Sequence, residues 1–383
     1  MSNAMEYTRY LADKIGYRLS GTEGERSASN YIKEVLDRLG IESQKESFQF
    51  CRGPIHPYMI ILTISLIGGL FSPSYKFLGF LFTSMGAVAF HMEYHYRSWF
   101  LRRSLQGDSE NVIGKIPSKA EKPSRRIVIS AHYDSSRAGL VFHPRIVGNF
   151  RVFSLLTLIG VFGLPVFIIC GEVIFSSFFG FLRSVSVLWI ILVLLMMLQR
   201  ELDGKKGSGA NDNASGVGVM LSLAENIAAQ PLEKTEVWIA ATSCEDAGMA
   251  GMRSFLSRHE QEMQDALIIN VSNVGAGFLK YITGEGMLKV YPSDPELLLF
   301  SAEVVRETPE ISLVPHEYRT LPTAAHAALV GGYRAMSVMA LDEEGVIPNW
   351  RWETDTVENL EEQNLLEAEK FLNLLIKKLD MES

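Results

Sequence analysis

The sequence has few cysteines: among 383 residues only Cys51, Cys170 and Cys244 occur, far apart from one another. They form no closely spaced pair of the kind that binds metals, and their odd number does not suit a framework of disulfide bonds. No histidine adjoins Cys170 or Cys244 to activate a thiolate. We therefore expect reduced, ordinary thiols and give little weight to a catalytic cysteine.

Positive charge is also scarce. The chain has 36 Lys and Arg against 44 Asp and Glu, a formal net charge of -8. A nucleic-acid partner would need a basic face, so we expect none. The N-terminal segment is polar and lacks the apolar core of a signal peptide, so we expect no cleavable signal. We find no internal repeat and no low-complexity tract.

Apolar residues are abundant at 47% of the chain, whereas charged residues make up 21%. They concentrate in two blocks. Residues 58–90 are interrupted at 72–76 by the segment SPSYK, and residues 152–198 are interrupted by Glu172 and Arg183. Such a composition is unusually apolar for a purely soluble protein, so membrane insertion is the first possibility to consider.

The two blocks differ in the length of their uninterrupted apolar segments. Residues 152–171, and 184–198 with the apolar residues before them, are long enough to cross a bilayer as helices. The halves of the first block are nearer the length of buried core helices, so core helices or a lid are the alternative. We predict two transmembrane hairpins that interrupt one peptidase-like domain. The predicted bounds are 1–56, 96–150 and 201–383 for that domain, 57–95 for the first hairpin and 151–200 for the second.

Both hairpins would return the chain to the side that it left, so all soluble parts lie on one side of the membrane. The hairpin tips carry little charge beyond Lys76, Glu172 and Arg183. Basic residues gather on the opposite side, close to the spans: Arg97, Arg102, Arg103, Arg145, Arg151, Arg200, Lys205 and Lys206. The positive-inside rule then predicts an integral membrane protein with a cytoplasmic soluble domain.

Outside the apolar blocks, helical and strand-like segments alternate. Helices are expected at 25–39, after Asn213 and from Val357 to about Leu379, the last capped by Asp355 with Glu358. The expected strands are 47–50, 111–116, 126–135, 236–246, 265–274 and 335–341. Apolar strands between helices predict an α/β fold with a mixed, mostly parallel sheet sandwiched by helices.

Three polar motifs end an apolar strand or begin the following segment. They are SAHYDSS with His132 and Asp134, GANDNASGVG with Asp212, and SCEDAGMAG with Glu245 and Asp246. In a parallel sheet such strand ends meet at one edge. Imidazole and carboxylate groups suit zinc, and a shared carboxylate can bridge two ions. Each motif also has a structural interpretation: a strand-end histidine, a helix N-cap and a solvated helix start.

The order and spacing of these motifs resemble those of the di-zinc aminopeptidases, a family that includes glutamate carboxypeptidase and shares its fold with the non-catalytic nicastrin and nicalin. The resemblance extends over RLSGTEGERSASNYI, AHYDS, GANDNASG, CEDAGMAG, NVSNVG and NWRWETDT, essentially all of the soluble chain. It implies the zinc-exopeptidase fold, with His132 on the first metal, Asp212 bridging and Asp246 on the second metal. It also implies Glu245 as the general base, with Asp134 orienting His132.

The departures from the family pattern concern two of the five expected metal-ligand positions. Ser272 stands where the family has a carboxylate, Arg351 stands where it has a histidine, and Asp246 is one methylene shorter than the usual Glu. The neighbouring carboxylates cannot all ionise without a cation. We hypothesise that the permanently charged guanidinium of Arg351 replaces the second metal. Conceivable substitute ligands lie in the same C-terminal region: Glu353, His326, Glu343 and Glu344.

The sequence therefore leaves the function open. One interpretation is a membrane-anchored, zinc-dependent exopeptidase of the aminopeptidase type with a degenerate metal site, holding one or two zinc ions. The alternative is a catalytically inactive pseudopeptidase without zinc that acts as a binding or scaffold protein. A weaker third is a single-metal hydrolase or cyclase. The retained Glu245 favours the first, and Ser272 and Arg351 favour the second. Expected partners are a peptide substrate or a membrane protein, and the lipid bilayer.

One further hypothesis depends on strand order. If segment 111–116 runs antiparallel between strands 47–50 and 126–135, the two outer strands are parallel. Both apolar blocks then leave the sheet at the edge that holds His132, and the pocket faces the bilayer. We expect Trp350 and Trp352 to pack in the core rather than contact a ligand.

Overall fold

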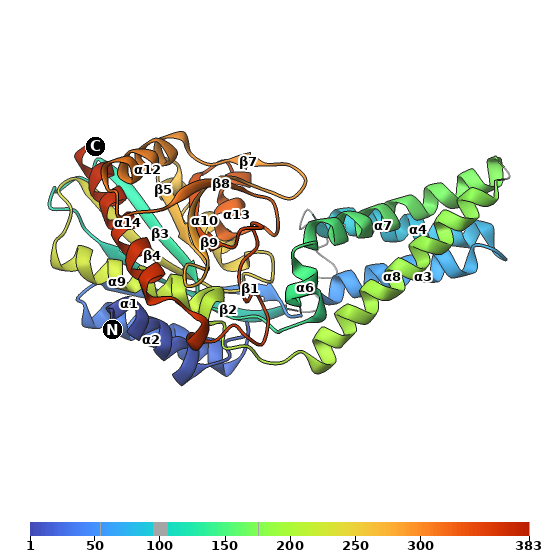
Figure 1. Ribbon diagram of the computed structural model, residues 1–383, viewed down its shortest axis with the longest axis horizontal. Helices are drawn as coiled ribbons and strands as arrows, with labels where there is room; N and C mark the ends of the chain where they lie inside the picture. Colours follow the sequence, from blue (N-terminus) through green and yellow to red (C-terminus); the bar gives the residue numbers. More distant parts are fainter. Residues whose placement is uncertain (54, 95–105, 175, 383) are drawn as a thin grey trace. The chain divides into compact units, whose positions relative to one another are not determined.

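The structure is a computed structural model that describes residues 1–53, 55–94, 106–174 and 176–382 (Figure 1). It divides into two compact units, each described by itself. Unit 1 comprises Met1–Phe50, Gly107–Ala138 and Lys206–Ser383, and unit 2 comprises Cys51–Gln106 and Gly139–Lys205. Three of the basic residues invoked for membrane orientation lie outside the described residues: Arg97, Arg102 and Arg103.

Unit 1 is built on one sheet, to which the described residues contribute nine strands in the order β1-β2-β4-β3-β5-β9-β6-β7, with β8 paired to β6. The strands are β1 (Glu42–Cys51), β2 (Gln106–Ile116), β3 (Arg125–His132), β4 (Thr235–Thr242), β5 (Leu267–Val271), β6 (Phe278–Glu285), β7 (Tyr291–Pro292), β8 (Val314–Tyr318) and β9 (Arg334–Leu341). The central strands β4, β3, β5 and β9 are mutually parallel, while β2 and β6 flank them antiparallel. The predicted mixed, mostly parallel sheet is confirmed.

Helices cover both faces of the sheet because alternate strand residues point to opposite sides. Residues such as Ile127, Ile129 and Ile239 join one large core, and their strand neighbours Val128 and Trp238 are buried on the other face. One group of helices packs together over the first face: α1 (Asn3–Arg9), α9 (Ser215–Ala229), α12 (Pro295–Glu307) and α14 (Glu362–Met381). The other helices of unit 1 are α2 (Glu23–Arg38), α10 (Ala250–Arg258), α11 (Glu260–Met263) and α13 (Ala324–Val330).

Two sequence-based expectations about the sheet are wrong. Segment 111–116 in β2 does not lie beside β3, because β4 lies between them, paired antiparallel to β2 and parallel to β3. The argument that the pocket faces the bilayer thus loses its premise. Strands β6, β7 and β8 were also not expected; β7 has only two residues, and β8 is mostly exposed and carries Pro315.

In the part of unit 2 that the structure describes, four long helices form a bundle. They are α3 (His56–Phe71), α4 (Lys76–Tyr94), α7 (Phe150–Val173) and α8 (Ser177–Asp203), with the short α6 (Pro144–Val147) before α7. The pairs α3–α4 and α7–α8 form hairpins, and α4 packs on α7 and α3 on α8. Apolar side chains from all four helices, such as Ile61, Phe90, Leu164 and Ile190, form a shared core.

Within the described part of unit 2, α7 and α8 are long and apolar enough to cross a membrane, whereas α3 has 16 residues. Many apolar side chains of α7 and α8 are exposed in the structure. The turn between α7 and α8 lies between the two charged residues that interrupt this apolar block, Glu172 near the end of α7 and Arg183 in the first part of α8.

Candidate functional site

The sequence motifs meet at the carboxyl edge of the parallel strands. His132 ends β3 opposite Thr242, the last residue of β4, so the segments that follow both strands leave the sheet side by side. Ser272 follows β5 directly, and Asp212 lies in the turn 210–214 that leads into α9. Arg351 comes from the loop after β9. Residues far apart in the chain thus reach one place because parallel strands share their carboxyl ends.

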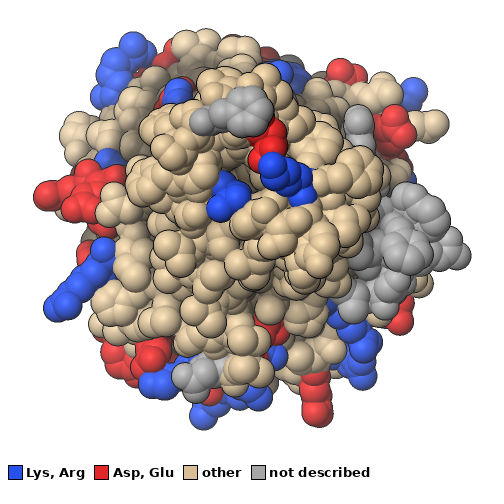
Figure 2. Space-filling model, turned by 90° about the vertical axis from the view of Figure 1, so that its right-hand side faces the viewer, with Lys and Arg blue, Asp and Glu red and all other residues tan. Residues whose placement is uncertain are grey.

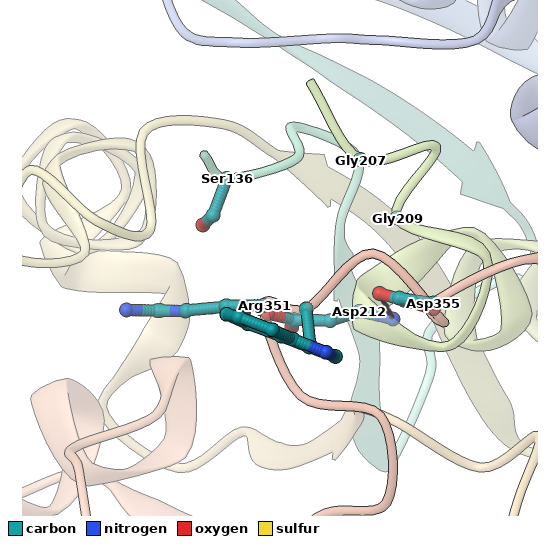
Figure 3. Close-up of a pocket in the computed structure, with 7 residues that line it drawn as sticks. Ser136, Gly207, Gly209, Asp212, Arg351 and Asp355 are labelled. Carbon is teal, nitrogen blue, oxygen red and sulfur yellow. Dashed lines mark hydrogen bonds and ion pairs between the residues drawn. The ribbon is translucent and has the colours of Figure 1, made fainter. Parts of the chain in front are cut away.

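Oppositely charged groups alternate across the site. The His132 ring lies between two carboxylates, with Nε2 3.3 Å from Asp212 Oδ1 and Nδ1 3.4 Å from Asp134 Oδ1. On the far side of Asp212, Arg351 Nε is 3.4 Å from Asp212 Oδ2. The same guanidinium places Nη2 2.5 Å from Asp246 Oδ1. In Figure 3 the Arg351 side chain lies alongside Asp212 and extends across the recess away from Asp355.

Neutral donors hold the carboxylates in place. Ser20 Oγ donates to Asp134 Oδ2 at 3.1 Å, and the backbone N–H of Glu245 donates to the same carboxylate at 3.1 Å. Ser136 Oγ donates to Asp246 Oδ2 at 2.7 Å. Asp134 therefore both orients His132 and fixes the turn that carries the acid pair.

Asp355 belongs to the site, and its predicted role as a helix cap is wrong. Its carboxylate accepts the backbone N–H groups of Asn211 at 2.5 Å and Asp212 at 3.2 Å. The C-terminal helix instead begins at Glu362, preceded by Glu361. A helix cap is predicted from residues a few positions apart in the sequence. The partners of Asp355 are more than a hundred positions away, so no local sequence pattern indicates this contact.

Arg18 was also missed by the sequence analysis. It is fully buried, and its guanidinium donates only to backbone carbonyls: Tyr133, Leu11, Gly16, Ser208 and Gly209. Burial lowers its pKa to about 10. By holding the carbonyls that precede the turn 210–214, Arg18 fixes the backbone from which Asp212 projects. Its position in the motif RLSGTEGERSASNYI was the available signal.

The acids of the site fall into two groups, those whose pKa is raised and those whose pKa is lowered. Burial and the charges of Asp134 and Asp212 raise the pKa of Glu245 to about 8, and the charges of His132 and Arg351 oppose this shift only in part. Burial and the charge of Asp212 raise the pKa of Asp355 to about 7. For Asp212 itself, burial is outweighed by the contact and charge of His132 and the charge of Arg351, so its pKa is lowered.

The pKa values of the two cationic side chains, His132 and Arg351, are both raised. Burial alone would lower the pKa of His132, but the contacts with Asp134 and Asp212 raise it well above its ordinary value. Burial also opposes the charge of Arg351, yet Asp246 and Asp212 raise its pKa. The site therefore stabilises two organic cations among its carboxylates.

The donor set does not fit a pair of zinc ions. Among the residues that the structure describes, no three His, Cys, Asp or Glu side chains are placed to share a metal. The guanidinium of Arg351 carries no lone pair for a metal and occupies one oxygen each of Asp212 and Asp246. The Ser272 hydroxyl donates to Asn273 Oδ1 at 2.6 Å instead of completing the site.

A small recess adjoins Arg351. It is lined by Ser136, Gly207, Gly209, Asp212, Arg351, Trp352 and Asp355. Trp352, expected to pack in the core, is thus part of the lining. None of the conceivable substitute ligands borders this recess: Glu353, His326, Glu343 and Glu344.

Comparison with known proteins finds a family match within the chain. Residues 195–307, the region that carries Asp212, Glu245, Asp246 and Ser272, match peptidase family M28. Together with the solved structures described below, this match confirms the resemblance to the di-zinc exopeptidases. The search of curated proteins finds no match to the chain.

Solved structures show the same fold. A zinc aminopeptidase from Bacillus subtilis superposes with a TM-score of 0.60 at 14% identity, over 98% of this chain and 94% of that chain. A Zn-dependent exopeptidase from Parabacteroides distasonis gives 0.58 at 13% identity, over 98% and 97%. A glutaminyl cyclase from Tannerella forsythia gives 0.56 at 14% identity, also over 98% and 97%. At these identities the likeness establishes the zinc-exopeptidase type of fold and leaves the chemistry to the site.

Proposed function

We propose that this chain is a membrane-anchored pseudopeptidase, a metal-free binding or scaffold protein for a peptide or membrane-protein partner. The observation that carries the proposal is the position of Arg351. It lies in the place where the family pattern has a metal-binding histidine, and it forms ion pairs with both Asp212 and Asp246. The guanidinium thus supplies the positive charge that the second metal provides in zinc exopeptidases.

Displacement of Arg351 by zinc would be costly. The Arg351 side chain is 11% exposed, and its partners Asp212 and Asp246 are 4% and 9% exposed. Breaking a buried ion pair by removing one member typically costs about 3–5 kcal/mol, since the remaining charge stays desolvated. A zinc ion at this place would gain two carboxylates but would gain no histidine, and it would lie beside a guanidinium that cannot lose its proton.

Membrane anchoring is part of the proposal and is supported by α7 and α8. A cytoplasmic location of unit 1 is supported by basic residues at the ends of these helices away from the turn, such as Arg151 and Arg200. A thiol label that does not cross membranes, applied to intact and opened cells, tests this orientation on a variant in which Cys51, Cys170 and Cys244 are replaced and one cysteine is added on the surface of unit 1. Labelling in intact cells would contradict it.

The competing function is a zinc-dependent exopeptidase, and one observation favours it. Glu245 is retained beside the ionic cluster, and a pKa of about 8 suits a group that exchanges protons near neutral pH. The test is hydrolysis of a panel of fluorogenic aminoacyl substrates by the full chain in detergent with added zinc. Glu245→Gln serves as the matched control, and an active M28 aminopeptidase verifies the assay.

The proposal predicts no zinc-dependent turnover that distinguishes the wild type from Glu245→Gln. Zinc-dependent hydrolysis by the wild type that disappears in Glu245→Gln would establish the exopeptidase and refute the pseudopeptidase. A titration of the same panel against the zinc-free chain then measures whether the peptides bind without being cleaved.

A further inference from the structure

We propose that unit 2 is adapted to a thin bilayer, with an apolar belt of about 22 Å where a typical hydrocarbon core is about 30 Å. This inference rests on the membrane anchoring in the proposed function and adds to it the kind of membrane that fits. It depends on unit 2 alone, and so it is independent of the chemistry at Arg351.

Three of the four bundle helices have short uncharged stretches. In α3 the stretch is 57–71, in α4 it is 77–90 and in α8, between Arg183 and Arg200, it is 184–199. Each contains about 14 to 16 residues, and at about 1.5 Å per residue each covers about 21–24 Å. Three helices with different sequences therefore agree on one thickness.

The fourth helix is longer but does not set the thickness. Residues 152–171 of α7 form an uncharged stretch of about 20 residues, or about 30 Å of helix. A long helix can fit a thin membrane by tilting, whereas a short helix cannot lengthen to span a thick one. The three short helices therefore set the thickness. Pro165 inside α7 adds a site where the helix axis can bend.

Contacts between ionisable side chains mark both ends of the apolar belt. At the end with the turns, Lys76 Nζ is 2.6 Å from Glu172 Oε2, joining α4 to α7. Figure 2 shows this end as a mostly uncharged surface on which a few basic and acidic side chains gather. At the opposite end, His56 Nε2 is 3.4 Å from Glu201 Oε2, joining α3 to α8. A thicker bilayer would draw one of these charged ends into hydrocarbon, which is unfavourable for ionised groups.

Aromatic residues follow the same boundaries. Tyr75, 58% exposed, precedes Lys76 at the turn end, and Tyr58 and Tyr94 lie at the opposite ends of α3 and α4. Tyrosine prefers the membrane interface because its ring is apolar and its hydroxyl needs water. The aromatic residues thus support the boundaries that the charges define.

The test reconstitutes the full chain in fluid phosphatidylcholine bilayers that differ only in acyl-chain length: dimyristoleoyl, dioleoyl and dierucoyl. The readout is hydrogen exchange of the backbone amides of α3 and α8 during heating, which reports on unit 2 without interference from unit 1. We expect the amides of α3 and α8 to remain protected to the highest temperature in the dimyristoleoyl bilayer. The dierucoyl bilayer should lower that temperature by at least about 5 °C.

Arg183 offers a matched pair of variants. Arg183→Leu extends the uncharged stretch of α8 by about one to two turns toward Ser177, so it should move the optimum toward longer acyl chains. Arg183→Lys keeps the charge at the same place and should leave the optimum unchanged. Maximal protection of the wild type in dioleoyl or dierucoyl bilayers, or an optimum that does not respond to Arg183→Leu, would overturn the inference.

Flotation of the wild-type chain with vesicles before and after a carbonate wash separates failure of this inference from failure of membrane anchoring. A chain that resists the wash but prefers thick bilayers contradicts the thin belt only. A chain that is released by the wash contradicts the anchoring itself, and the thin-belt inference with it.

Discussion

Replacement of Arg351 by methionine is the most informative perturbation of the candidate site. Methionine has a similar length and no charge, so the change removes the cation and leaves most of the apolar contacts. Asp246 would keep the donor Ser136 at 2.7 Å, and Asp212 would keep His132 at 3.3 Å. Each carboxylate would lose its contact with a permanent cation while staying almost wholly buried.

The expected loss follows from the burial. Removing one member of a buried ion pair costs about 3–5 kcal/mol, out of a total stability of about 5–15 kcal/mol for a typical domain. For a domain the size of unit 1, this corresponds to a fall of roughly 10 °C in the midpoint of thermal unfolding. An exposed ion pair would lose less than about 1 kcal/mol.

The assay is urea unfolding of Arg351→Met, Asp246→Asn and the double variant in one detergent, as a double-mutant cycle. The buried-pair account predicts that the double variant is more stable than Arg351→Met, because no carboxylate is left unpaired at position 246. A loss below about 1 kcal/mol for Arg351→Met, or additive losses in the double variant, would refute the idea that Arg351 compensates the buried carboxylates.

Three further predictions concern other parts of the chain. Asp355→Ala should lower the free energy of unfolding by about 2–4 kcal/mol, because two buried backbone N–H groups lose their acceptor, and urea unfolding measures this. Gly86→Leu should disrupt the α3–α4 hairpin, because even a Cβ there would clash with the Ser65 side chain. A Cβ at Gly180 meets nothing within 4 Å, so Gly180→Leu serves as the control, and monodispersity in detergent distinguishes the two variants. Burial lowers the pKa of His326 to about 4. The unfolded chain therefore binds more protons, and stability falls by up to about 3 kcal/mol as pH decreases from about 6.5 to 4, a loss that His326→Gln should abolish.

The sequence was sufficient to predict the central part of the fold. The strands that carry His132 and precede Glu245 are continuous apolar segments, as parallel strands buried on both faces require. Because the carboxyl ends of such strands share one edge, the convergence of the polar motifs also follows from the sequence. The charge argument for Arg351 needed only the permanent charge of arginine and the neighbouring acids.

The features that the sequence did not predict depend on contacts between residues that are far apart in the chain. The insertion of β4 between β2 and β3 is a crossover that no local pattern encodes. The acceptor role of Asp355 requires the turn 210–214 to lie beside the loop after β9.

The most direct test of the central claim is the amount of zinc per chain. Elemental analysis would be made on protein purified in detergent without chelator, before and after incubation with excess zinc and removal of the unbound ion. The account predicts background zinc in both samples, because Arg351 already holds Asp212 and Asp246. Near-stoichiometric zinc in either sample would mean that Arg351 yields its place to a metal, and would contradict the account.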